Sequence, residues 1–169
     1  MTVFSVGQDM AGIRDALTRM VAVGRNPQRL LGAIGLGLES STRERMRDGV
    51  DPDGVKWESY APLNPLYERG KKGAGILLGP DLHLYNSIRS GVDGNAVVVG
   101  TDVIYGRVHQ YGAIIQPKNA PQLSFVMGDV LIHASSVHVP ARPYLGFSSE
   151  DREMVVGQLE DMYTSAIRR

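Results

Sequence analysis

The four histidines of this chain, His83, His109, His133 and His138, are its best candidates for acid–base or metal chemistry. His133 and His138 stand five residues apart in a strand-like stretch, so they face opposite sides of a regular strand. A zinc site needs such side chains to converge with further ligands, and the chain has no cysteine to supply one. His109 follows Tyr105 by four residues, a helical spacing that packing explains more simply. The histidines therefore predict no metal site.

Three further strings start like ligand-binding loops but lack essential positions. DPDG at residues 51–54 begins like a calcium loop, but Pro62 stands where the bidentate Glu is required. GKKG at residues 70–73 lacks the earlier glycine and the following hydroxyl residue of a phosphate loop. GAIGLG at residues 32–37 has the wrong glycine order for a dinucleotide site. We expect no catalytic, cofactor-binding or metal-binding residues, and no enzyme.

The composition favours protein partners over nucleic acid and membranes. The 169 residues suit one domain spanning residues 1–169, and 43% of them are apolar. The 18 basic residues balance the 18 acidic ones, so no overall field attracts polyanions. No apolar run approaches the roughly 20 residues that span a bilayer, and the first residues lack the pattern of a signal peptide. A chain without cysteine fits the cytosol.

The first third of the chain predicts two helices with apolar faces that could contribute to the core of the domain. Apolar residues at three- and four-residue spacing mark the first one: Met10, Ile13, Leu17, Met20 and Val21. Gly24 is expected to end this helix. Asn26 is expected to cap the second, with Pro27 at its first position. That helix carries Leu30, Leu31, Ile34 and Leu38 and should end before Gly49, while its glycines at residues 32–37 would allow another backbone close.

The rest of the chain alternates strands and short helices. Residues 96–99 predict a strand, residues 82–88 a strand or short helix, and residues 123–132 a hairpin turning at Gly128 and Asp129. Ser148 and Asp151 resemble a capping box that opens a last helix. Its apolar face would comprise Met154, Val155, Leu159, Met162, Tyr163 and Ala166. We therefore expect an α+β fold, with the N-terminal helix pair and the C-terminal helix packed on a central antiparallel β-sheet.

Two features of the middle of the chain bear on stability and mobility. Trp57 is the only tryptophan and follows the turn at residues 51–54, which is typical of a buried structural anchor. Residues 67–79 are rich in glycine and lysine and have few apolar anchors, so a flexible loop is expected there.

Five short strings, in order, resemble the phage virion morphogenesis family, the tail-completion proteins of Mu-like and related contractile-tailed phages. They are PDGVKW at 52–57, IL with LYNSI at 76–77 and 84–88, VVG at 98–100, Tyr105 with HQYG at 109–112, and VPARPYLG at 139–146. The resemblance covers the chain from residue 51 onward, and the paired N-terminal helices also fit. Asp81 departs from it, because the family pattern has glycine at that position.

The resemblance implies a non-catalytic protein that completes the tail or joins tail to head. It implies partners among phage tail and head–tail connector proteins, a homo-oligomer that could close into a ring, and a place in the host cytoplasm during assembly or in the tail or neck of the virion. Arginine and tyrosine are frequent at interface hot spots, and turn-prone basic loops are free to make contacts. The candidate assembly residues are Arg142, Pro143, Tyr144, Arg69, Lys71 and Lys72.

Three alternatives remain open at this stage. The segment at residues 142–144 could instead only orient the last helix. A nucleic-acid-binding protein would use Arg69, Lys71 and Lys72, and its binding would fall steeply with salt. A small hydrolase would use His109 or His138, and it predicts a concave pocket around one of them.

Overall fold

The computed structural model describes residues 11–73 and 75–168. Its three long helices are α1 (Ala11–Arg25), α2 (Gln28–Asp48) and α7 (Ser149–Arg168). The short helices are α3 (Trp57–Tyr60), α4 (Pro65–Gly70), α5 (His83–Ser87) and α6 (Gly106–Tyr111). The strands are β1 (Arg89–Asp93), β2 (Ala96–Gly100), β3 (Ala113–Ile115), β4 (Leu123–Met127), β5 (Val130–Ala134) and β6 (Val137–Val139).

The predicted α+β class is confirmed, but the single central sheet is wrong. Among the described residues the strands form three separate antiparallel pairs, β1–β2, β3–β6 and β4–β5. Two pairs are hairpins closed by glycines with positive φ, Gly94 at 58° and Gly128 at 62°. β3 and β6 precede and follow the β4–β5 hairpin in the sequence, and they pair with each other over three residues. Each described strand therefore has one hydrogen-bonded neighbour, and the three pairs do not join into one sheet.

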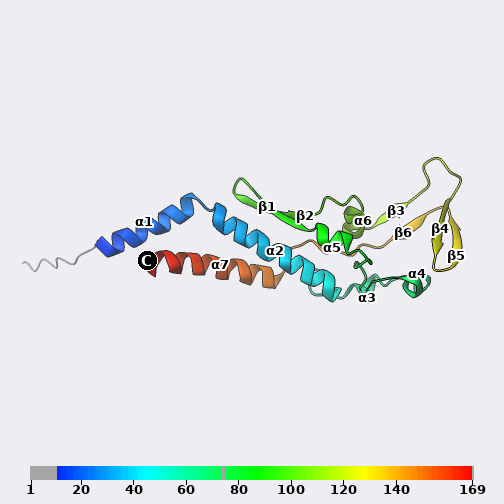
Figure 1. The fold of residues 1–169 in the computed structure, drawn as a ribbon, viewed down its shortest axis with the longest axis horizontal. Helices are drawn as coiled ribbons and strands as arrows, with labels where there is room; N and C mark the ends of the chain where they lie inside the picture. Colours follow the sequence, from blue (N-terminus) through cyan, green and yellow to red (C-terminus); the bar gives the residue numbers. More distant parts are fainter. Residues whose placement is uncertain (1–10, 74, 169) are drawn as a thin grey trace, which may run out of the picture.

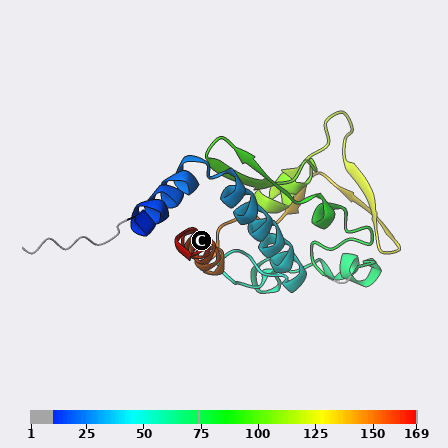
Figure 2. The same cartoon turned by 60° about the vertical axis from the view of Figure 1, so that its left-hand side comes forward.

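Helix α2 is the centre of the fold. It packs on α7 along one side and on the β1–β2 hairpin along another (Figure 2). Its glycines were expected to allow another backbone close, but the near neighbours of Gly35 and Gly37 are side chains, and Gly32 has no neighbour within 4 Å. A Cβ on Gly35 would lie 3.2 Å from the Cβ of Ser90 in β1, and one on Gly37 would lie 2.8 Å from the Sδ of Met154 in α7. A side chain at Gly35 would require Ser90 to give way, whereas one at Gly37 would require the flexible end of Met154 to move.

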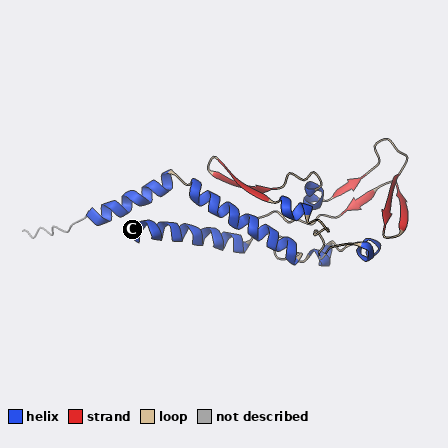
Figure 3. Ribbon diagram, in the orientation of Figure 1, coloured by secondary structure: helices blue, strands red, loops and turns tan. Residues whose placement is uncertain are grey.

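The molecule is elongated, with α1 beside the C-terminal end of α7 at one end and the β4–β5 hairpin at the other (Figure 1). The long helices lie toward the first end, the β1–β2 hairpin runs along α2, and the strands β3 to β6 lie toward the second end together with short helices (Figure 3). The hairpin touches the rest of the chain near α4, where a Cβ on Gly70 would lie 3.2 Å from the Cα of Gly128. The three long helices therefore do not pack together on one sheet. Instead α1 packs on α7, α2 packs on α7 and on the β1–β2 hairpin, and the β4–β5 hairpin projects from the other end.

The apolar face predicted for the first helix does not reach the core. Ile13, Leu17 and Val21 are 56%, 57% and 52% exposed, while Met10 lies outside the described residues. The reason is that α1 turns a different face to α7, where the Nε of Arg19 donates to the backbone oxygen of Ala166 at 2.7 Å. The helix is amphipathic as predicted, but none of residues 11–73 and 75–168 covers its apolar stripe.

The helix boundaries follow local signals closely, with one exception. Helix α1 ends at Arg25, one residue after the predicted Gly24 stop, and Gly49 closes α2 with a left-handed φ of 71°. The capping box is confirmed, since Asp151 N donates to Ser148 Oγ at 3.1 Å and Ser148 N donates to Asp151 Oδ2 at 2.9 Å. The Asn26 cap is wrong: Pro27 takes the cap position, and no side chain caps α2.

The core lies where the far end of α2, the turns after it and the segment before α7 meet. Its buried members are Met46, Trp57, Leu77, Leu84, Ile88 and Tyr144. The predicted burial of Trp57 is confirmed at 0% exposure. In the described part of the chain, no helix is both long enough and apolar enough to cross a membrane.

Candidate functional site

The segment predicted to be a contact surface, Arg142-Pro143-Tyr144, lies inside the molecule. Arg142 is 6% exposed and Tyr144 is 1% exposed, so the expectation that these residues form an assembly surface is wrong. Arg142 donates from Nε to the Ala61 oxygen at 2.7 Å and from Nη2 to the Pro62 oxygen at 2.8 Å. Tyr144 belongs to the apolar core, where burial raises its pKa to about 12.

A glutamine holds this buried segment in place. Gln110 Oε1 accepts from the backbone N–H groups of Tyr144 and Leu145, both at 3.0 Å, and its Nε2 donates to the Leu145 oxygen at 2.8 Å. From the other side, Trp57 Nε1 donates to the Pro143 oxygen at 3.0 Å. The alternative reading, in which the segment positions the chain before the last helix, is therefore the one that fits.

A buried ion pair that the sequence did not reveal ties α2 to the start of α7. Arg45 Nη1 donates to Asp151 Oδ2 at 2.9 Å, and its Nη2 donates to the Gly146 oxygen at 3.1 Å. Burial alone would raise the pKa of Asp151, but hydrogen bonds from Ser41 and Ser148 and the Arg45 guanidinium outweigh it and lower that pKa. The sequence pattern predicts Asp151 as part of a capping box, but it does not predict Arg45 as its partner.

The turn at residues 51–54 is built on its own hydrogen bonds. Asp51 Oδ1 accepts from Asp53 N at 3.0 Å and from Val55 N at 2.8 Å, an Asx-type turn. Its Oδ2 accepts from the Tyr60 hydroxyl at 3.0 Å, and burial together with this bond raises the pKa of Tyr60 to about 12. The Asp51 carboxylate is therefore occupied as a turn former, and the predicted structural turn is confirmed.

A cleft of about 710 Å³ opens between α4, α5, α6 and the segment after β6. His83, His109 and His138 all line it, together with Tyr105 and Lys71. Tyr105 stands edge-on to His83 and to His109, at ring distances of 6.1 and 5.9 Å. Burial and then the nearby Arg142 guanidinium hold the pKa of His109 below its usual value.

This cleft is the concave pocket that the hydrolase alternative requires, but the pocket does not bring a histidine next to a hydroxyl or thiol nucleophile of the kind that a Ser–His–Asp triad uses. The described residues that line it include no serine, threonine or cysteine. No group of three or more His, Cys, Asp or Glu side chains is placed to hold a metal ion within the described ranges. His109 packs edge-on against Tyr105, and its buried Nδ1 has no hydrogen-bond partner among the described residues.

The structure separates the basic residues of the glycine-lysine loop, Arg69, Lys71 and Lys72. Arg69 and Lys72 are exposed, whereas Lys71 lines the cleft and its Nζ donates to the Leu78 oxygen. Burial lowers the pKa of Lys71. With one of three cations engaged on the chain itself, the nucleic-acid alternative has little local charge to use. Lys71 and Arg142 meet at the cleft, while Arg69 lies elsewhere, on the side facing the hairpin.

The predicted mobility of residues 67–79 can be tested by amide exchange. Arg69 lies in the short helix α4, which has no buried residue, and Lys72 is exposed, so hydrogen bonds here are open to solvent and the backbone amides should exchange rapidly. Leu77 and Leu78 are each 7% exposed. These two buried side chains anchor the end of the segment, where few apolar anchors were expected. We expect rapid exchange over residues 69–73 and slower exchange at 77–78. Strong protection of residues 69–73 in the isolated protein would contradict the prediction.

Comparison with known proteins agrees with this arrangement. A family model described as the phage virion morphogenesis family matches residues 8–163. The chain is also 24% identical over 170 residues to "Putative capsid assembly protein G" of Escherichia phage Mu, covering 98% of this chain and 97% of that protein. No solved structure matches. Because the family match extends over nearly the whole described fold, this chain belongs to the phage virion morphogenesis family.

Proposed function

We propose that this protein is a non-catalytic assembly protein that completes the phage tail and joins it to the head through protein contacts. The observation that carries the proposal is the family match over residues 8–163, which supports a role in building the virion. A relative named for capsid assembly supports the same role. A protein at the head–tail joint would meet parts of both kinds, which fits a virion family with a capsid-assembly relative.

The two ends of the molecule support a bridging role. At one end α1 exposes the stripe of Ile13, Leu17 and Val21. At the other, Val126 and Leu131 are direct cross-strand partners on the β4–β5 hairpin and are 68% and 60% exposed. Exposed apolar groups of this kind mark sites of protein contact more often than they serve a free monomer. An elongated chain with such groups at both ends is suited to hold two partners apart.

The proposed partners are tail and head–tail connector proteins and further copies of this chain. The protein would act in the host cytoplasm during assembly and could stay in the tail or neck of the finished particle. Arg69 and Lys72 remain the exposed candidates for contact on the glycine-lysine loop, since Arg142 and Tyr144 are buried and Pro143 is half-buried.

Complementation of a phage that lacks the gene provides the test. Wild-type protein is expected to restore infectious tailed particles, whereas without it electron microscopy should show separate heads and tails. Reversing charge at Arg69 and Lys72 to Glu should lower the yield of infectious particles at least tenfold if the loop contacts a partner. The matched control reverses two other exposed cations, Arg107 and Lys118.

Other outcomes would overturn the proposal in distinct ways. Normal tailed particles without the gene would remove the assembly role. Absence of heads, with tails intact, would move the role to the capsid and contradict tail completion. An unchanged particle yield for the Arg69/Lys72 variant would exclude the loop as a contact while leaving the assembly role in place.

A further inference from the structure

Helix α1 carries an apolar stripe that no described residue of its own chain covers. Ile13, Leu17 and Val21 are spaced four residues apart on one helical face, and each is more than half exposed. Between residues 12 and 25, none of the α1 side chains whose burial is described is buried. Since most of a helix's stability in a folded protein comes from packing its apolar face, this helix is incompletely packed in a single copy.

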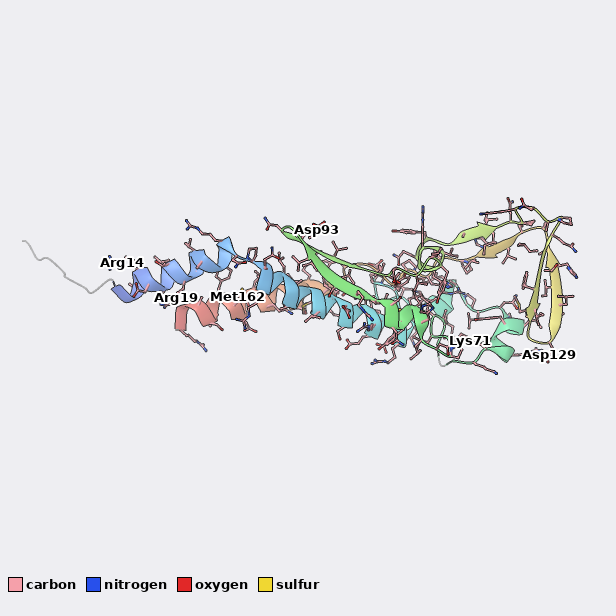
Figure 4. The ribbon with its side chains drawn as sticks, turned by 45° about the horizontal axis from the view of Figure 1, so that its top comes forward. Arg14, Arg19, Lys71, Asp93, Asp129 and Met162 are labelled. Atoms are coloured by element: carbon pink, nitrogen blue, oxygen red, sulfur yellow. The ribbon has the colours of Figure 1, made fainter. Side chains whose placement is uncertain are left out.

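The borders of the stripe are basic. Arg14 and Arg25 are exposed on its flank, and α1 contains three arginines against one aspartate. Arg19 and Met162 lie where α1 and α7 face each other, while Arg14 lies near the start of α1 (Figure 4). The stripe therefore presents apolar side chains edged with positive charge to the outside. A matching surface would be apolar and edged with carboxylates.

Helix α7 presents such a surface on its outer face. Val156 and Ile167 are 48% and 52% exposed and lie on one face with the exposed Glu153 and Glu160, at spacings of three, four and seven residues. The helix has four exposed carboxylates against two exposed arginines, one of which, Arg152, lies over the Phe147 ring. Neither Glu153 nor Glu160 takes part in an ion pair among the described residues. The half-buried residues Leu159, Met162 and Ala166 occupy a different face of α7.

We propose that the α1 stripe of one copy docks on the outer face of α7 in a second copy of this chain. The two faces cannot meet within one molecule, because α1 already packs on α7 through other residues. Two different surfaces then meet between identical chains, a head-to-tail contact. Repetition of such a contact closes a ring if the rotation permits. This inference rests on the proposed assembly function and names the contact through which copies associate.

Self-association of the full-length protein, followed by light scattering after size exclusion over a range of concentrations, is the test. Wild type should associate as concentration rises. Leu17→Glu should weaken association at least about tenfold, because it places a carboxylate in an apolar contact. Val156→Glu combined with Ile167→Glu should do the same from the other side. Leu36→Glu is the control: Leu36 is 67% exposed on α2, outside both faces, and should associate like wild type.

Mixing the two defective variants distinguishes a head-to-tail contact from a symmetric one. The Leu17 variant keeps an intact α7 face, and the Val156/Ile167 variant keeps an intact α1 stripe. Each alone should stay monomeric, whereas an equal mixture should form dimers through the one intact pair of faces. A contact between two α1 stripes, or between two α7 faces, would not give this result.

Cross-linking provides a readout that does not depend on losing a contact. The chain has no cysteine, so Leu17→Cys and Val156→Cys each introduce one thiol. Under mild oxidation a mixture of the two variants should form disulfide dimers well above the level of either alone. Circular dichroism should show that every variant keeps its helices.

A wild type that stays monomeric, a Leu17→Glu protein that associates like Leu36→Glu, or a mixture that yields no dimer would each overturn the contact. The proposed assembly function would survive any of these results, provided that the wild-type gene still restores tailed particles in complementation. Loss of complementation by the wild type, with self-association intact, would instead overturn the function.

Discussion

Replacing Trp57 with Ala is expected to lower the free energy of unfolding by about 3–5 kcal/mol, the usual cost of emptying a core aromatic site. The side chain is fully buried among Met46, Leu84 and Tyr144 in the core. Its Nε1 donates to the Pro143 oxygen at 3.0 Å, so the substitution also leaves a carbonyl without this donor. Both effects act where the chain after α2 meets the segment before α7.

Denaturant unfolding followed by circular dichroism is the measurement, because removing the only tryptophan also removes the usual fluorescence probe. Trp57→Phe separates the two contributions, since it keeps most of the ring volume but loses the N–H donor, and it should cost less than the alanine variant. Tyr111→Ala is the control, because Tyr111 is 74% exposed on α6 and should change stability by less than about 0.5 kcal/mol. An unchanged midpoint for Trp57→Ala would refute its role as an anchor.

The parts of this fold that the sequence predicts correctly are those that depend on residues close to one another in the chain. The capping box of Ser148 and Asp151, the left-handed Gly49 and the Gly128 hairpin turn are all local devices, and each lies where the pattern indicated. Helix and strand periods located α2, β2 and α7 for the same reason. Each depends on side chains close in sequence, which a single chain displays directly.

What sequence could not predict depends on contacts between distant segments. The alternation in residues 123–132 defines a hairpin but not whether that hairpin joins β2, so one sheet was expected where three pairs exist. Helix α1 has the same amphipathic pattern whether its apolar stripe packs on this chain or on another one. Periodicity shows that a face is apolar, and it does not show what covers that face.

The family strings mark the core more than a contact surface. Trp57, Leu77, Leu84, Ile88 and Tyr144 come from three of these strings and lie in one buried cluster. In the fourth, Gln110 clamps the backbone at Tyr144 and Leu145. Arg142 and Tyr144 were read as contact residues because their types are frequent at interfaces, yet the same types serve a core when their polar atoms find partners. Residue type alone did not separate these two roles.

The buried pair of Arg45 and Asp151 carries the second large expected effect. Replacing Asp151 with Asn, or Arg45 with Met, should cost about 3–5 kcal/mol, because removing one partner leaves the other buried without its counter-charge. The two charged groups have only 7% and 1% of their side chains exposed, so solvent screens them little. Asp161→Asn removes an exposed carboxylate from the same helix and should stay within about 0.5 kcal/mol of wild type.

The pair also fixes the sign of the pH dependence. The pKa of Asp151 is lowered in the folded protein, so the stability it contributes is present above its ordinary pKa of 3.8 and is lost as pH falls through the lower folded value. Unfolding free energies of wild type should therefore drop on acidification below about pH 4. Asp151→Asn should be less stable at pH 7 and show a shallower fall in that acid range, since its side chain no longer titrates. Replacing both partners with apolar residues should recover part of the loss at pH 7 and likewise flatten the acid limb. Parallel acid limbs for wild type and Asp151→Asn would show that other carboxylates, and not this pair, govern acid unfolding.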